Sequence, residues 1–288
     1  MMRSEKFFYD YDDYESGEKD ALTLAQEVLA DSDLPDLDEL VIGCWGESYD
    51  NSVQSLLDEF TANADKLRHL KSLFIGDMDY EECEVSWIEQ GNYEELLAAL
   101  PGLEKLTIKG SVGLSLGKVR HAALQEIEII CGGLPKNVLH ELAAAELPAL
   151  TKLNLYLGVE EYGFDGGIED VKTLLHSPLM RQLTYLGLGD SEWQDEVVEA
   201  VLEVLPLLRL EVLDFSNGTL TDQGGQLLLD AKDKLKNLKK IDLTYHFLSD
   251  EMMERLKATG LPFVLDDPQE TDIDEDDGYI YRFPMLTE

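Results

Sequence analysis

The chain has 288 residues and a formal net charge of −37, from 60 acidic and 23 basic side chains. Because phosphate contacts need a basic surface, this charge argues against binding to nucleic acid or to an anionic membrane. It favours attraction of a basic partner instead, and 44% hydrophobic residues suffice for a sizeable core.

The N-terminal residues are acidic and contain neither a signal-peptide core nor a membrane span, so we expect a cytoplasmic protein. The cysteines Cys44, Cys83 and Cys131 are far apart, which indicates free thiols. Residues 1–33 are predicted to be an acidic segment that ends in a capping helix over 20–29. The first 18 residues are expected to be mobile.

A repeated pattern, L-x-x-L-x-L, occupies most of the remaining chain. Its apolar triplets begin at Leu37, Leu70, Leu103, Leu124, Leu150, Leu183, Leu210 and Leu238. Counted between third positions, the spacings are 33, 33, 21, 26, 33, 27 and 28 residues. Eight copies in succession indicate a repeat architecture, in which each unit buries its apolar face against its neighbours.

Each copy predicts a strand followed by a helix. In L-x-L the two apolar side chains point to the same face of a strand. Amphipathic stripes follow, as in 53–60 and 197–205, and proline closes several of them. Residues 34–265 are therefore predicted to form an α/β solenoid, a horseshoe with about eight parallel strands on the concave side and helices on the convex side.

The C-terminal part begins with a predicted last strand over 262–265. Residues 266–288 are predicted to be an acidic tail with a short capping strand, of which 268–278 are expected to be mobile.

The repeats resemble the leucine-rich-repeat superfamily, nearest to the ribonuclease-inhibitor type. The stretches 76–106, 156–163 and 248–253 resemble an uncharacterised family of bacterial cytoplasmic leucine-rich-repeat proteins. This resemblance implies a solenoid fold and no particular activity. The chain departs from the usual repeat, because the turn position that often holds Asn never does so here. That position holds Trp45, Met78, Ser111, Gly132, Gly158, Ser191, Gly218 and His246.

Acidic side chains recur at the C-terminal concave positions. Asp214 and Asp242 should be neighbours on adjacent strands, where like charges raise one pKa. Asp190 and Tyr245 lie one column over, with His246 beyond them. We expect this surface to bind a basic protein segment, although two splayed, solvated carboxylates are the simpler interpretation.

A second surface is expected near the N-terminal end, from Trp45, Phe74 and Asp77. Exposed aromatic residues beside charge are typical of protein interfaces. The alternative is that Trp45 only fills the first turn.

The sequence predicts no catalytic residue, metal site or cofactor. The function expected is a non-enzymatic scaffold that binds a basic protein. One alternative is an inhibitor or immunity protein that masks a basic enzyme. Another is a protein that binds calcium or a small ligand through acidic loops such as 77–87, where Trp87 and Ile88 are expected to pack inward.

Overall fold

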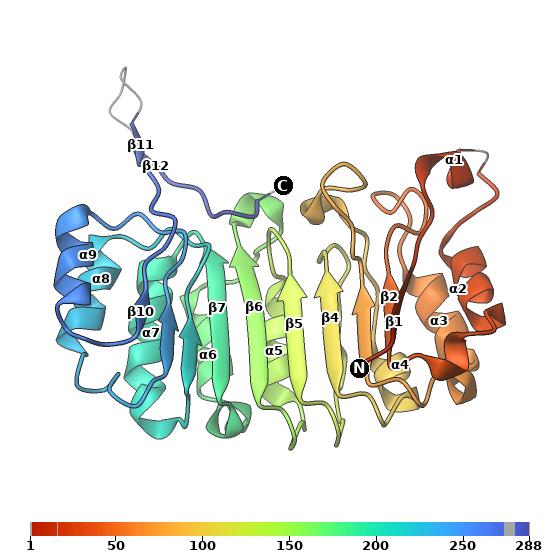
Figure 1. The fold of residues 1–288 in the computed structure, drawn as a ribbon, viewed down its shortest axis with the longest axis horizontal. Helices are drawn as coiled ribbons and strands as arrows, with labels where there is room; N and C mark the ends of the chain where they lie inside the picture. The colour runs from red at the N-terminus through yellow and green to blue at the C-terminus, as the bar shows by residue number, and fades with distance from the viewer. Residues whose placement is uncertain (1, 16, 274–279, 288) are drawn as a thin grey trace. The chain divides into compact units, whose positions relative to one another are not determined.

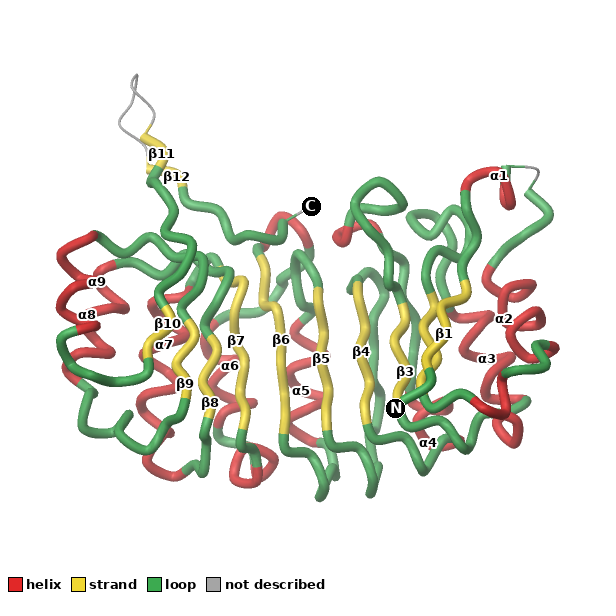
Figure 2. Tube along the Cα trace, in the orientation of Figure 1, coloured by secondary structure: helices red, strands yellow, loops and turns green. Residues whose placement is uncertain are grey.

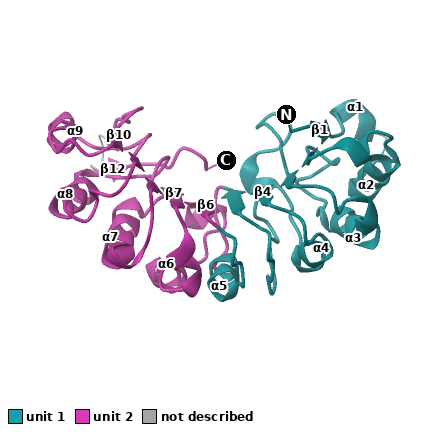
Figure 3. Ribbon diagram, turned by 60° about the horizontal axis from the view of Figure 1, so that its bottom comes forward, with its two compact units in different colours: residues 1–131, 137–150, 288 teal, residues 132–136, 151–287 magenta. Residues whose placement is uncertain are grey.

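The structure, a computed structural model, describes residues 2–15, 17–273 and 280–287. It consists of two compact units, coloured separately in Figure 3. Unit 1 spans residues 1–131 and 137–150, and unit 2 spans 132–136 and 151–287. Each unit is described by itself.

Unit 1 contains five parallel strands that neighbour one another in chain order (Figure 1). They are β1 (Ser4–Phe7), β2 (Glu39–Ile42), β3 (Ser72–Ile75), β4 (Lys105–Lys109) and β5 (Glu126–Ile130). Its helices are α1 (Tyr11–Tyr14), α2 (Ala21–Ala30), α3 (Gln54–Ala62), α4 (Glu94–Ala99) and α5 (Lys136–Ala144). Helices α2 to α5 lie on one side of the strands, which leaves the other side of the strands, the open face, without helices (Figure 3).

Unit 2 repeats this arrangement with five further parallel strands. They are β6 (Lys152–Gly158), β7 (Tyr185–Ser191), β8 (Val212–Asp214), β9 (Lys240–Asp242) and β10 (Phe263–Val264). Its helices α6 (Ile168–Leu175), α7 (Gln194–Val204), α8 (Asp222–Asp230) and α9 (Asp250–Lys257) lie on one side. A separate antiparallel pair joins β11 (Asp272–Ile273) and β12 (Ile280–Tyr281).

The motif residues build the core of both units. Every apolar position of the eight motifs is buried, with at most 7% of its surface exposed. Neighbouring motifs pair in register, for example Leu40 with Leu73 and Leu213 with Ile241. Burying such a side chain stabilises the fold by roughly 1.5–3 kcal/mol, so the pattern that predicts the strands also holds them together.

Several helices begin at a side chain that caps their first turn. Asp20 accepts a hydrogen bond from the backbone N–H of Thr23 at the start of α2. Thr221 and Ser249 do the same at the starts of α8 and α9. These caps satisfy N–H groups that have no partner inside the helix.

The structure has ten parallel strands, so the expectation of about eight was too low. The two strands that carry no motif are β1 and β10, at the first and last positions of the order, and β10 lies within the last strand predicted over 262–265. Strand β1 carries no motif and lies in a segment that was expected to be mobile. Its backbone pairs with β2, from Ser4 against Glu39 to Phe7 against Ile42, because an exposed strand edge can be satisfied by any extended segment.

The connection between β4 and β5 forms no helix in residues 110–125, all of which are described. This is the place of the 21-residue spacing, which is too short for a strand, a helix and two turns. No helix of the described part of the chain is long and apolar enough to cross a membrane.

Candidate functional site

Large aromatic side chains gather at one edge of unit 1. The aromatic rim consists of Phe8, Tyr11, Tyr49, Tyr80 and Trp87, with exposed fractions between 47% and 75%. They lie in the segments that follow β1, β2 and β3, and parallel strands bring these carboxyl ends to one edge. Figure 2 shows long loops leaving these three strands. Large exposed apolar side chains brought to one edge in this way mark a candidate interaction site.

Contacts between the loops hold part of the rim together. The rings of Tyr11 and Tyr14 meet edge to face, with centroids 5.6 Å apart. Burial raises the pKa of Tyr14 to about 12, and the nearby Cys44 and Tyr49 add to this rise. Desolvation, Glu47 and Asp50 likewise raise the pKa of Tyr49. The first two loops also touch directly, since the Tyr9 N–H donates to the Cys44 carbonyl at 2.8 Å. The carboxylates of Glu47 and Asp50 lie near Tyr49.

The third loop is stabilised by its own acidic residues. Asp79 Oδ1 accepts the backbone N–H groups of Glu81 and Glu82, at 2.9 and 3.0 Å. Glu82 Oε2 in turn accepts the N–H of Asp79 at 2.9 Å. These carboxylates shape the turn that presents Tyr80, rather than converging on a cation. Ile88 is buried as expected, but Trp87 is exposed, which corrects the prediction that it packs inward.

At the second predicted surface, the exposure expected of Trp45 is wrong, and the alternative role of this residue holds. Trp45 is fully buried, and its indole N–H donates to the carbonyl of Asn51 at 2.8 Å, so it fills the turn after β2. Phe74 lies half-buried on the open face of β3. Asp77 pairs with Lys6 at 3.2 Å. The sequence did not single out other exposed aromatic residues, such as Tyr49 and Tyr80. Both lie among acidic residues in stretches without apolar periodicity, which is a pattern that could have indicated exposed loops.

On the open face of unit 2, Asp214 and Asp242 are neighbours in the sheet register, as predicted. Both carboxylates already have partners within the chain. Asp214 accepts the Tyr185 hydroxyl at 2.5 Å and the Ser216 hydroxyl at 2.6 Å. Asp242 accepts the Thr244 hydroxyl at 2.6 Å and pairs with Lys240 at 2.6 Å.

The expected rise of a pKa at this pair does not occur for Asp242. Burial alone would raise the pKa of Asp242, but hydrogen bonds from Lys240 and Thr244 outweigh burial and lower it. The same ion pair raises the pKa of Lys240. Lys240 thus neutralises the charge of Asp242, whereas hydroxyl groups satisfy the Asp214 carboxylate without neutralising it.

Asp190 and His246, placed on the binding surface by the sequence reasoning, are both fully buried. His246 Nδ1 accepts the N–H of Leu248 at 3.1 Å, and burial lowers the pKa of this imidazole. Asp190 lies beneath the C-terminal segment, whose Leu286 N–H it accepts at 2.9 Å. Tyr245 is half-buried and donates to the Phe283 carbonyl at 3.1 Å. These residues cannot form the open acidic surface that was predicted.

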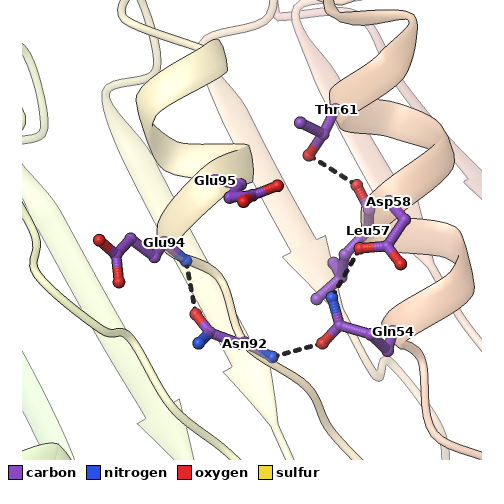
Figure 4. Close-up of a pocket in the computed structure, with 7 residues that line it drawn as sticks. All are labelled: Gln54, Leu57, Asp58, Thr61, Asn92, Glu94 and Glu95. Carbon is purple, nitrogen blue, oxygen red and sulfur yellow. Dashed lines mark hydrogen bonds between the residues drawn. The ribbon is translucent and has the colours of Figure 1, made fainter.

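Two pockets lie on the helical side of unit 1. One of about 390 Å³, between α3 and α4, is lined by Asp58, Glu94 and Glu95 (Figure 4). Gln54 crosses it, accepting the N–H of Asn92 at 2.7 Å and donating to Asp58 at 2.8 Å. The other, of about 630 Å³, is lined by parts of α4, α5 and the helix-free connection after β4.

One cluster of acidic residues could hold an ion in the described part of the chain. Glu5, Asp31 and Asp33 approach one another closely, but Arg3 pairs with Asp33 at 3.0 Å. Histidines serve main-chain roles: His69 and His121 contact the carbonyls of Leu34 and Leu100 at 2.8 and 2.9 Å.

The described residues define an α/β protein of ten parallel strands whose helices pack, in each unit, on one side of the strands. A crystal structure of a protein from Bacteroides fragilis is similar to it, with 40% sequence identity and a TM-score of 0.84. The match covers 98% of this chain and 77% of that chain. The chain belongs to the same family as that Bacteroides protein. No family model matches the sequence, and no curated protein matches it either.

Proposed function

We propose that the chain is a non-enzymatic leucine-rich-repeat protein that binds a basic protein partner. The support for the repeat type is the run of eight motifs, each a buried parallel strand, with helices packed on one side. A solenoid of such repeats offers an extended surface for a partner. The three cysteines all lie in the described part of the chain and are free thiols. Free thiols are typical of proteins that act in the reducing cytoplasm.

The aromatic rim is the observation that carries this proposal. Tyrosine and tryptophan supply large rigid contact area and are enriched among the residues that dominate binding energy. Here they stand beside carboxylates such as Glu47 and Asp50. An arginine or lysine side chain can pair with these acids and stack on the rings at once. The net charge of −37 adds long-range attraction for a partner of opposite charge.

A pull-down with the tagged full-length chain from native cytosol, read by mass spectrometry, tests the proposal. We expect one stoichiometric basic protein, whose capture weakens at high salt because exposed charges are screened. Replacing both Tyr80 and Trp87 by Ala should reduce capture by about tenfold or more, since such residues typically contribute 2 kcal/mol or more each.

The matched control is Leu207→Ala. Leu207 is also a large exposed side chain, but it lies in unit 2, outside the rim. Capture should be unchanged by this substitution. Equal capture by the wild-type chain and the Tyr80/Trp87 double variant, or capture of an acidic protein, would contradict the proposal.

A further inference from the structure

The C-terminal segment, residues 282–287, crosses the carboxyl ends of strands in unit 2 (Figure 1). It is held by three hydrogen bonds to three successive repeats. The Leu286 N–H donates to Asp190 Oδ1 at 2.9 Å, and the Met285 N–H donates to the Asn217 carbonyl at 2.8 Å. The Tyr245 hydroxyl donates to the Phe283 carbonyl at 3.1 Å.

The three residues that hold the segment occupy equivalent places. Asp190, Asn217 and Tyr245 each stand two residues after the last apolar position of their motif. Each has a left-handed backbone, with φ of 53°, 67° and 62°. This conformation is uncommon for residues other than glycine, and least favourable for a bulky one such as Tyr245. Such outliers cluster at ligand-binding and functional sites.

The three bonds from the repeats involve the main chain of the segment, not its side chains. Phe283 and Met285 are exposed, while Pro284 between them is buried. Main-chain contacts give affinity without reading the sequence, so another extended segment can make them equally well. Pro284 is thus the one buried side chain of the segment, and a competing segment needs proline at that place but can vary elsewhere.

The Asp190 carboxyl is only half satisfied by this occupant. The residue is 0% exposed, and its Oδ2 is buried without a hydrogen-bond partner among the described residues. A buried polar atom of this kind costs free energy unless a donor reaches it. Leu286 offers one N–H and an apolar side chain, so an occupant with a second donor at this place would fit better.

We propose that Asp190, Asn217 and Tyr245 form a binding site for an extended peptide segment of another protein, and that the C-terminal segment occupies this site in cis. The ligand class is an extended stretch with proline at the place of Pro284 and an arginine or lysine at the place of Leu286. Its cationic side chain would favour the ionised carboxylate and donate a hydrogen bond to Oδ2. The site lies in unit 2, so it does not rest on the aromatic rim of unit 1.

With the C-terminal segment in place, the Asp190 carboxyl keeps its proton near neutral pH. Burial raises the pKa of its carboxyl to about 8, opposed by the Leu286 N–H. A cation placed beside the carboxyl would favour its ionised form. The present occupant provides no such charge.

The test is binding of fluorescent peptides to full-length variants. The probes are the heptapeptide YRFPMLT, which is the sequence of residues 281–287, and the same peptide with arginine at its sixth position. Leu286→Pro removes the N–H that bonds Asp190 and should release the tethered segment. Because a tethered occupant acts at an effective concentration of roughly millimolar, this variant should bind both peptides at least tenfold more tightly than the wild-type chain.

Two variants control this experiment. Leu286→Ala keeps the N–H, so it should bind peptide as weakly as the wild-type chain. Adding Asp190→Ala to Leu286→Pro should abolish binding, and the arginine peptide should lose more than the leucine peptide. Absence of binding by the folded Leu286→Pro variant, or binding that ignores Asp190, would overturn the proposal.

Amide hydrogen exchange of the wild-type chain gives a second, independent readout that no misfolded variant can obscure. A displaceable segment opens locally, so the amides of Met285 and Leu286 should exchange much faster than those of Leu186 and Leu188 in β7. Exchange of all four at one common rate would show that the segment is a permanent part of the fold, and would overturn the proposal.

Discussion

Unit 1 and unit 2 are built from the same repeat, yet they end their strands differently. After β1, β2 and β3 the chain forms long loops that present aromatic side chains to solvent. After β7, β8 and β9 it forms turns with left-handed residues, and the C-terminal segment covers them. The buried motif thus determines the strands, while the segment after each strand determines whether that edge is open or occupied.

The two tryptophans of unit 1 give the largest expected difference. Trp45 is fully buried, so Trp45→Ala should lower the free energy of unfolding by about 3–5 kcal/mol through lost burial and a cavity. Trp87 is exposed, so Trp87→Ala should change it by no more than about 0.5 kcal/mol. Urea unfolding of both variants measures this, and equal losses would place Trp87 in the core.

Asp190 makes unit 2 sensitive to pH. Its carboxyl has an ordinary pKa of 3.8 when unfolded and about 8 when folded, so the folded state binds the extra proton between these values. Its contribution to stability is complete below the unfolded pKa and is lost as pH rises towards 8. One pKa unit corresponds to about 1.4 kcal/mol, so the total change is on the order of a few kcal/mol.

Asp190→Asn should remove this dependence, because the amide keeps the acceptor for Leu286 and does not titrate. Denaturant unfolding of both proteins at about pH 5.5 and about pH 8.5 measures the effect by linkage. The wild-type chain should lose stability relative to the variant at the higher pH. Parallel losses would show that the carboxyl is already ionised at neutral pH.

One tyrosine from each unit allows the two edges to be compared by removing a single hydroxyl group. Tyr245→Phe removes the bond to the Phe283 carbonyl and should cost about 0.5–1.5 kcal/mol. Tyr49→Phe, at the open rim, should change stability by less than about 0.5 kcal/mol. Thermal melts of the two variants decide between an occupied and an open edge, and a larger loss for Tyr49→Phe would reverse the assignment.

The smallest effect is expected at the Lys6–Asp77 pair. Both side chains are more than a third exposed, and the Lys6 ammonium lies 3.2 Å from the Asp77 carboxylate. Asp77→Asn should cost about 0–1 kcal/mol, less so at high salt. A loss above this range would mean that the pair anchors β1 and is more than a surface contact.

For the predicted binding sites, the pairing of neighbouring strands was predicted correctly, but the solvent exposure of several side chains was not. Periodicity places Asp214 beside Asp242 because strands repeat every two residues. It does not show how these acids are satisfied: Asp214 accepts hydroxyl groups of Tyr185 on β7 and Ser216 in the turn after β8. Asp242 pairs with Lys240, two residues before it on β9 itself. Trp45 and His246 occupy the turn position that Asn often fills in such repeats. That position faces the interior of the protein, so both side chains belong to the core.

The sequence alone determined the eight motif strands, most of the helices between them and the core, because each copy of the leucine pattern buries its apolar side chains against the next copy. It also determined the net charge, which is a sum over residues. Only the tertiary structure decided which edges are open. The C-terminal segment is nearly a hundred residues from Asp190 in the chain, and their contact depends on a path through unit 2 that no periodic signal encodes. The same holds for β1, which joins the sheet through backbone bonds that any extended sequence could make.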